Sequence, residues 1–207
     1  MTNYAQTERH ALADLFDKVG PDAPTLCGDW STADLAAHLV VRERRPDGAV
    51  GIVVPPLAGY AEKVRLGTRD ANRWADLVNR VRSGPPVFLR PLDASVNTVE
   101  YLVHHEDVRR AGADWAPRTL DPAEEAVLWK RLGLLGRVLL RGAPVGVELV
   151  SPGHGRSQPK SGDLSVTVTG PPSELLLFAF GRQTRSHVTV DGDELSVERV
   201  RTASLGL

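Results

Sequence analysis

The stretch AEEAVLWKRLGLLGRVLLRGAPVGVELVS, residues 123–151, changes its periodicity near Gly142 and decides the fold class. Before Gly142 the apolar residues recur at the spacing of a buried helix face. Beyond it, apolar and polar residues alternate with a period of two, as they do in half-buried strands. The sequence therefore predicts an α+β protein, with a helical domain over residues 1–142 and a small α+β domain over residues 143–207.

Several further helices are predicted in the helical part from apolar spacing and from residues that start and stop helices. They cover residues 7–19, 32–45, a short piece near 57–66, part of 68–86, and a segment from an N-cap at Asn97 to about 111. Ser31 with Asp34 three positions later makes a capping-box-like start for the second of them. Asp121 and Pro122 start the last helix in the same part of the chain.

The small domain is predicted to contain three strands and two short helices. The strands are VGVELVS, LSVTVTG and RSHVTVD, and the helices are PPSELLLFAFGR and LSVERVRTA. The segment SPGHGRSQPKSGD, residues 151–163, is rich in glycine, proline and serine, which favours a hairpin loop.

The composition excludes several classes of protein. Basic and acidic residues number 25 and 26, so the net charge of −1 gives no field that would attract nucleic acid or an anionic membrane. No signal peptide and no membrane-spanning stretch is recognisable, and the single cysteine, Cys27, rules out an intrachain disulfide. We therefore expect a cytoplasmic protein without nucleic-acid or membrane partners. The oligomeric state stays open, with a homodimer as one option.

The segment VEYLVHHEDVRRA, residues 99–111, carries the candidate chemistry. Residues four apart share a helix face, so Glu100 and His104 stand together whereas His105 points elsewhere. His38 lies between Leu35 and Leu39 on the apolar side of its own helix and is the candidate third ligand.

Two imidazoles and one carboxylate suit Zn²⁺, and they also accept Ni²⁺, Mn²⁺ or Fe²⁺. Three protein ligands leave one coordination position for water or substrate, which is the format of a catalytic site. The alternative interpretation needs no metal: His38 is then a hydrogen-bonded core histidine, Glu100 belongs to a cap begun by Asn97, and His104 forms a surface pair.

Two segments carry a resemblance to a known family. WSTADLAAHL and VEYLVHHEDVRRA resemble the metal-binding domain of mycothiol-dependent maleylpyruvate isomerase and its relatives, which belong to the DinB-like four-helix-bundle superfamily. The strings TLCGDW and VVRERRPD resemble a subgroup of those relatives known only as metal-binding. This resemblance spans about residues 5–142, and the stretch from GVELV to RSHVTV resembles the small sterol-carrier-protein-like domain that often follows.

The resemblance implies roles for particular residues. His38, Glu100 and His104 take the three metal-ligand positions, and Asp107 takes the acidic position that follows them. It also implies mycothiol as a thiol cofactor and a transferase or isomerase acting on a small electrophile.

Three other residues are weighed from their surroundings. Arg42, one turn beyond His38, is a candidate for binding a carboxylate of the substrate or the thiol, with a salt-bridged helix end as the alternative. Asp107 is expected to orient a ligand imidazole or, alternatively, to pair with an arginine. Cys27 has no basic neighbour in the sequence and is expected to be a small buried residue rather than a nucleophile.

Two functions therefore remain. The first is a divalent-metal-binding protein that acts as a mycothiol-dependent S-transferase or isomerase on a small electrophilic substrate. The second is a non-catalytic metal-binding or ligand-sensing module in which the metal is structural. An open coordination position beside a pocket distinguishes the enzyme from the module.

Overall fold

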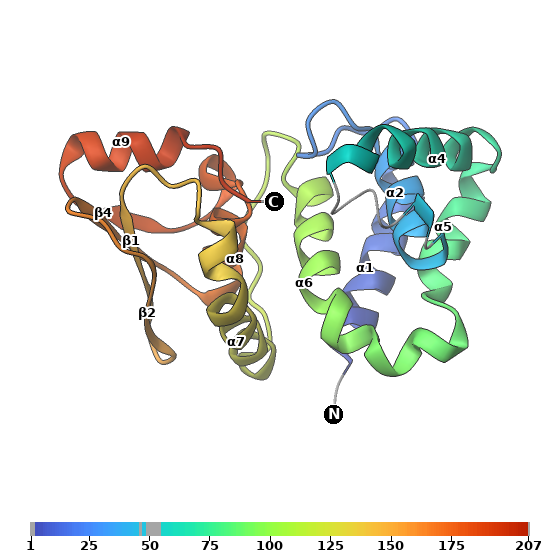
Figure 1. The fold of residues 1–207 in the computed structure, drawn as a ribbon. Helices are drawn as coiled ribbons and strands as arrows, with labels where there is room; N and C mark the ends of the chain where they lie inside the picture. Colours follow the sequence, from blue (N-terminus) through green and yellow to red (C-terminus); the bar gives the residue numbers. More distant parts are fainter. Residues whose placement is uncertain (1–2, 46, 49–54, 207) are drawn as a thin grey trace. The chain divides into compact units, whose positions relative to one another are not determined.

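A computed structural model describes residues 3–45, 47–48 and 55–206 of the chain. The chain divides into two compact units, Met1–Trp115 and Ala116–Leu207 (Figure 1). The described residues of the first unit form helices and turns, and the second unit combines helices with a four-stranded sheet. The predicted α+β class is therefore confirmed, whereas the units separate after Trp115 and not at residue 142 as the sequence predicts.

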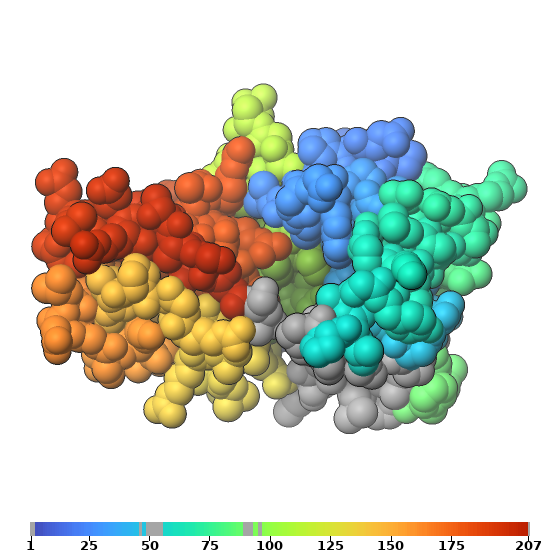
Figure 2. Space-filling model, turned by 45° about the horizontal axis from the view of Figure 1, so that its top comes forward, coloured from blue at the N-terminus to red at the C-terminus, as the bar shows by residue number. Residues whose placement is uncertain are grey.

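The N-terminal unit is built from helices whose apolar faces meet in one core. Its elements are α1 Tyr4–Val19, α2 Thr32–Arg44, η1 Pro55–Leu57, α4 Ala58–Asp70, α5 Trp74–Ser83, η2 Val87–Leu89 and α6 Arg90–Arg109. α1 packs against α5 and α6, and α2 packs against α4 and α5. Figure 2 shows the teal atoms of α4 beside blue atoms from around residue 25 at the surface of this unit. Phe16, Leu39 and Leu77 are among the fully buried side chains that join these helices.

The start of α2 follows the prediction. Ser31 is the N-cap, its side chain accepts from the backbone of Asp34, and the Asp34 carboxylate accepts from the backbone of Ser31, which completes a capping box. The same carboxylate also accepts hydrogen bonds from Arg65 and, at 2.8 Å, from Arg69, both on α4. One aspartate therefore both starts α2 and attaches α4 to it. α2 ends at Arg44, one residue before the predicted end at residue 45.

α6 begins earlier than the sequence predicts. The sequence predicts an extended piece over residues 87–93, ahead of a helix that starts at Asn97, but η2 and the first turn of α6 occupy these residues. Pro91 is the second residue of α6, where the missing N–H costs no helical hydrogen bond. Asn97 is consequently an interior residue of α6, and the predicted N-cap role for it is wrong.

The C-terminal unit places helices against a mixed sheet. Its elements are α7 Pro122–Leu139, β1 Gly146–Ser151, β2 Gly155–Lys160, β3 Ser165–Thr169, α8 Pro172–Ala179, η3 Gln183–Arg185, β4 Thr189–Asp191 and α9 Glu194–Thr202. The strand order is β2-β1-β3-β4, with β1 and β3 parallel and the two outer pairs antiparallel. Val147, Leu149, Val166 and Val168 are buried with the apolar residues of α8.

Two features of this unit correct the sequence prediction. β2 occupies part of the segment predicted as a loop, because an exposed edge strand of polar residues shows no apolar alternation and tolerates Pro159. α7 packs against α8 and β2, so it belongs to this unit rather than to the preceding helices. A Cβ at Gly136 would lie 3.2 Å from Pro159, which shows how closely α7 approaches β2.

Among the described residues, none of the helices has the length and apolar character needed to cross a membrane.

Candidate metal centre

Two histidines and a glutamate bring their ligand atoms together in the N-terminal unit. His38 lies on α2, and Glu100 and His104 lie one turn apart on α6. Glu100 Oε1 is 3.5 Å from His38 Nε2 and 3.2 Å from His104 Nε2. The ligand atoms of all three residues lie within 4.8 Å of one another. The structure thus gathers the three predicted ligands into one group that could hold a metal ion.

The spacing of this group fits a divalent cation. Metal bonds of about 2.0–2.2 Å in tetrahedral geometry separate neighbouring ligand atoms by roughly 3.3–3.6 Å. The separations of 3.2 and 3.5 Å around Glu100 Oε1 are close to that range. The three side chains are 12%, 21% and 13% exposed, so water has limited access to them. The imidazole and carboxylate donors suit zinc and other borderline metals, and they do not by themselves select one.

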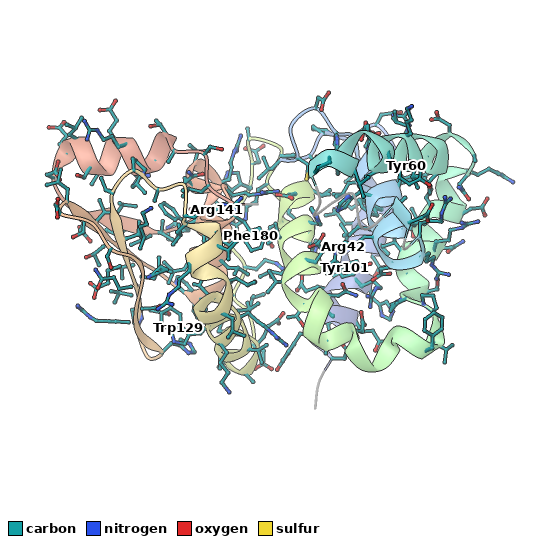
Figure 3. All side chains as sticks on the ribbon, in the orientation of Figure 1. Arg42, Tyr60, Tyr101, Trp129, Arg141 and Phe180 are labelled. Atoms are coloured by element: carbon teal, nitrogen blue, oxygen red, sulfur yellow. The ribbon has the colours of Figure 1, made fainter. Side chains whose placement is uncertain are left out.

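Arg42 lies beside this group. Its Nε is 3.2 Å from Glu100 Oε1, and its Nη1 donates a hydrogen bond to Asn97 Oδ1. Figure 3 labels its side chain between α2 and α6. Asn97 in turn donates to Glu43 at 3.1 Å and to Asp93 at 2.7 Å. Arg42 therefore contacts a candidate ligand directly, and Asn97 belongs to a buried polar network.

The second ring nitrogen of His104 faces Asp107 and Cys27. His104 Nδ1 is 3.0 Å from Asp107 Oδ2, and the Cys27 thiol donates to the same oxygen at 3.1 Å. The Asp107 side chain is 0% exposed. A carboxylate that accepts from one nitrogen of an imidazole fixes the ring and directs the other nitrogen toward a metal. The position of Asp107 is therefore consistent with the predicted role of orienting His104.

Burial and hydrogen bonds shift the pKa values of the three candidate ligands in different directions. Burial lowers the pKa of His38 and outweighs its hydrogen bond to Glu100. Burial alone would also lower the pKa of His104, but hydrogen bonds with Asp107, Cys27 and Glu100 hold it well above its usual value. Burial would raise the pKa of Glu100, but its hydrogen bonds with both histidines hold it well below. Because a metal ligand must be a deprotonated ring nitrogen, a cation that binds at His104 Nε2 competes with a proton for that atom.

His105 faces away from the group, as the helix phase predicts. Its Nδ1 lies 2.7 Å from Glu8 Oε2 of α1, and both side chains are buried. The adjacent histidines of α6 therefore serve different contacts. His104 lies among the candidate ligands, and His105 joins α6 to α1.

A cavity of about 240 Å³ borders His38, one of the three candidate ligands. Its lining residues are Trp30, His38, Val41, Ala58, Ala61, Glu62 and Arg65, from α2, α4 and the residue before the α2 cap. The ring of Trp30 lies 5.2 Å from the ring of His38, and the guanidinium of Arg65 lies 4.6 Å above Trp30. The cavity is therefore mainly apolar, and His38 belongs both to it and to the donor group.

Cys27 has contacts near this site that the sequence does not predict. It is half-buried and packs against the hydrophobic core, which agrees in part with the prediction of a small buried residue, and its sulfur also lies against His104 and Asp107. The contact spans 77 residues of sequence, so no spacing rule connects the two side chains. The position of Cys27 in a glycine-containing turn just before α2 is the only local signal.

No protein-family model, no curated protein and no solved structure matches the chain.

Proposed function

We propose that this protein binds a divalent cation through His38, Glu100 and His104 and uses it to join or rearrange a small electrophile with the help of a thiol. The observation that carries the proposal is the three-residue donor group bordering a cavity of about 240 Å³ through His38. Among the described residues this group has three donors, which leaves a position for an exogenous ligand. When bound, such a cation lowers the pKa of a thiol or water by several units and supplies a nucleophile at neutral pH.

The residues of the chain have separate tasks in this proposal. Asp107 holds the His104 ring in orientation through Nδ1. Arg42, now paired with Glu100 and Asn97, binds a carboxylate of the substrate or thiol once a cation shares the charge of Glu100. Trp30 and Val41 exclude water from the apolar part of the electrophile.

The identity of the metal, of the thiol and of the two domains is proposed from the family resemblance of the segments WSTADLAAHL and VEYLVHHEDVRRA. This resemblance favours zinc as the metal, mycothiol as the thiol, and a DinB-like bundle followed by a sterol-carrier-like domain. The packing of α1 against α5 and α6 and of α2 against α5 supports a bundle, and the β1–β3 sheet with α8 supports a small appended α+β domain. The lining of the cavity limits which electrophile can bind. Its apolar wall, together with the charged side chains of Glu62 and Arg65, favours a small molecule with one charged end.

The test begins with metal analysis of protein purified without a chelator or a histidine tag. We expect close to one zinc-class ion per chain at this site, loss of it in His38→Ala, and retention in His10→Ala, which removes an exposed histidine of α1. Thiol consumption is then followed with mycothiol, glutathione and cysteine against an activated haloarene and an unsaturated dicarboxylic acid.

Turnover that requires both metal and thiol supports the proposal. Metal binding without thiol-dependent turnover of any electrophile supports the non-catalytic module instead. Retention of both metal and activity in His38→Ala rejects the site.

A further inference from the structure

A second group of donor atoms lies on the opposite side of His104. Cys27 Sγ, His104 Nδ1 and an Asp107 carboxylate oxygen lie within 4.8 Å of one another. The sulfur is 3.7 Å from Nδ1 and 3.1 Å from Oδ2, and Nδ1 is 3.0 Å from Oδ2. This group uses Nδ1, whereas the His38–Glu100–His104 group uses Nε2. The two groups therefore share a residue without sharing a lone pair.

The backbone holds Cys27 in this position. Leu26 N–H donates to the carbonyl of Asp107 at 3.1 Å, which fixes the loop against the last turns of α6. The Thr25 hydroxyl accepts from Cys27 N–H at 3.1 Å and donates to the carbonyl of Trp30 at 2.8 Å. Gly28 follows with φ +66°, a conformation that favours glycine. The thiol is thus presented to α6 by a loop whose hydrogen bonds are already formed.

The spacing and chemistry of this group differ from those of the first. Tetrahedral zinc with a sulfur bond of about 2.3 Å and a nitrogen bond of about 2.0 Å places sulfur and nitrogen roughly 3.5 Å apart. The observed 3.7 Å matches this, and the carboxylate oxygen has to move by only a few tenths of an ångström. A thiolate and a carboxylate together neutralise a divalent cation, and the thiolate selects soft or borderline metals over Mg²⁺ or Mn²⁺.

We infer that Cys27, His104 and Asp107 form a second metal site, which takes a thiophilic cation of the Zn²⁺, Cd²⁺ or Cu⁺ class. His104 then connects two neighbouring ions through its two ring nitrogens. Binding at the second site removes the thiol proton of Cys27 and the Nδ1 proton of His104, and both leave to solvent. Binding at this site needs neither the thiol cofactor nor the electrophile. The site shares His104 with the proposed catalytic site, and metal bonds from Asp107 and Nδ1 replace the hydrogen bond between them.

The test is titration of the full chain with Cd²⁺, followed by the thiolate-to-cadmium absorption in the ultraviolet. Cys27 is the only cysteine of the chain, so an intrachain thiolate signal has one source. We expect two ions per chain in the wild type, with the absorption saturating at one equivalent. Cys27→Ser should lose the absorption and one ion, whereas His38→Ala should keep the absorption and lose the other ion.

Three results would overturn the inference. The first is a wild type without the absorption, in which case Cys27 only donates a hydrogen bond to Asp107. The second is a wild type that binds only one ion, which is lost in Cys27→Ser and in His38→Ala alike. The third is an absorption per chain that grows with protein concentration, which indicates cadmium bridging two chains. Glu100→Gln replaces His38→Ala if circular dichroism shows that the latter does not fold. Absence of thiol-dependent turnover leaves these readouts unchanged, so the two proposals fail separately.

Discussion

The adjacent histidines of α6 provide the sharpest test of the first metal site, because alanine at either position removes one buried imidazole from the same helix. Only His104 lies among the candidate ligands, whereas His105 contacts Glu8 of α1. Structural zinc sites with four ligands bind with about 10–16 kcal/mol, or about 2.5–4 kcal/mol per ligand. His104→Ala should therefore weaken zinc binding by a factor of roughly 10²–10³.

His105→Ala should leave zinc binding unchanged within about twofold and should still lower the stability. It removes a buried hydrogen bond to Glu8, a loss of about 1–3 kcal/mol. A comparison of melting temperatures without metal therefore does not distinguish the two variants, whereas a comparison of their zinc affinities does. Competition between the protein and a chelating dye for zinc measures that affinity, with circular dichroism as the check on folding. Equal loss of affinity in both variants, or loss only in His105→Ala, would refute the assigned helix phase and with it the site.

Three further predictions concern residues around the group. Asp107→Asn should lower the zinc affinity about 10- to 100-fold, as removal of an outer carboxylate does, and the same dye competition should show it; an unchanged affinity contradicts the orienting role. Arg42→Gln should keep the metal content and raise KM for a carboxylate-bearing substrate roughly 10- to 100-fold, because one charge-assisted hydrogen bond is lost, and equal effects on an uncharged substrate contradict this. Burial alone would raise the pKa of Asp34, but hydrogen bonds from Arg65 and the other donors lower it from 3.8 to about 2. Its contribution of about 2 kcal/mol is present above about pH 4 and is lost as the pH falls through about 2, so urea denaturation of Asp34→Asn and wild type should differ near pH 6 and converge near pH 2.

The predicted part of the site depends on contacts within single helices. Glu100 and His104 are four residues apart, so helix geometry alone places them on one face. His38 follows from its position between buried leucines of α2, and Ser31 with Asp34 follows from a local capping pattern. Each of these predictions needs only the sequence within about one turn.

The parts that the sequence does not predict depend on distant segments. Cys27 reaches His104 only because the Leu26 N–H pairs with the carbonyl of Asp107. The strand β2 exists because β1 offers it an edge, and its own residues lack the apolar alternation of a strand. The apolar periodicity of α7 predicts a helix but does not indicate to which unit the helix belongs. Its packing against α8 and β2 assigns it to the second unit.

The attachment of α4 through Asp34 has a consequence for amide hydrogen exchange. The buried residues of α4 are Ala61 and Arg65, so ion pairs with Asp34 and the stacking of Arg65 on Trp30 contribute much of what holds this helix. Helices with few buried apolar contacts open at lower free energy than the global unfolding of their domain. Deuterium should therefore enter the amides of α4 well before those of α1 or α2. Because α4 forms one wall of the cavity, its opening events expose the space beside His38 while the core of the unit stays closed.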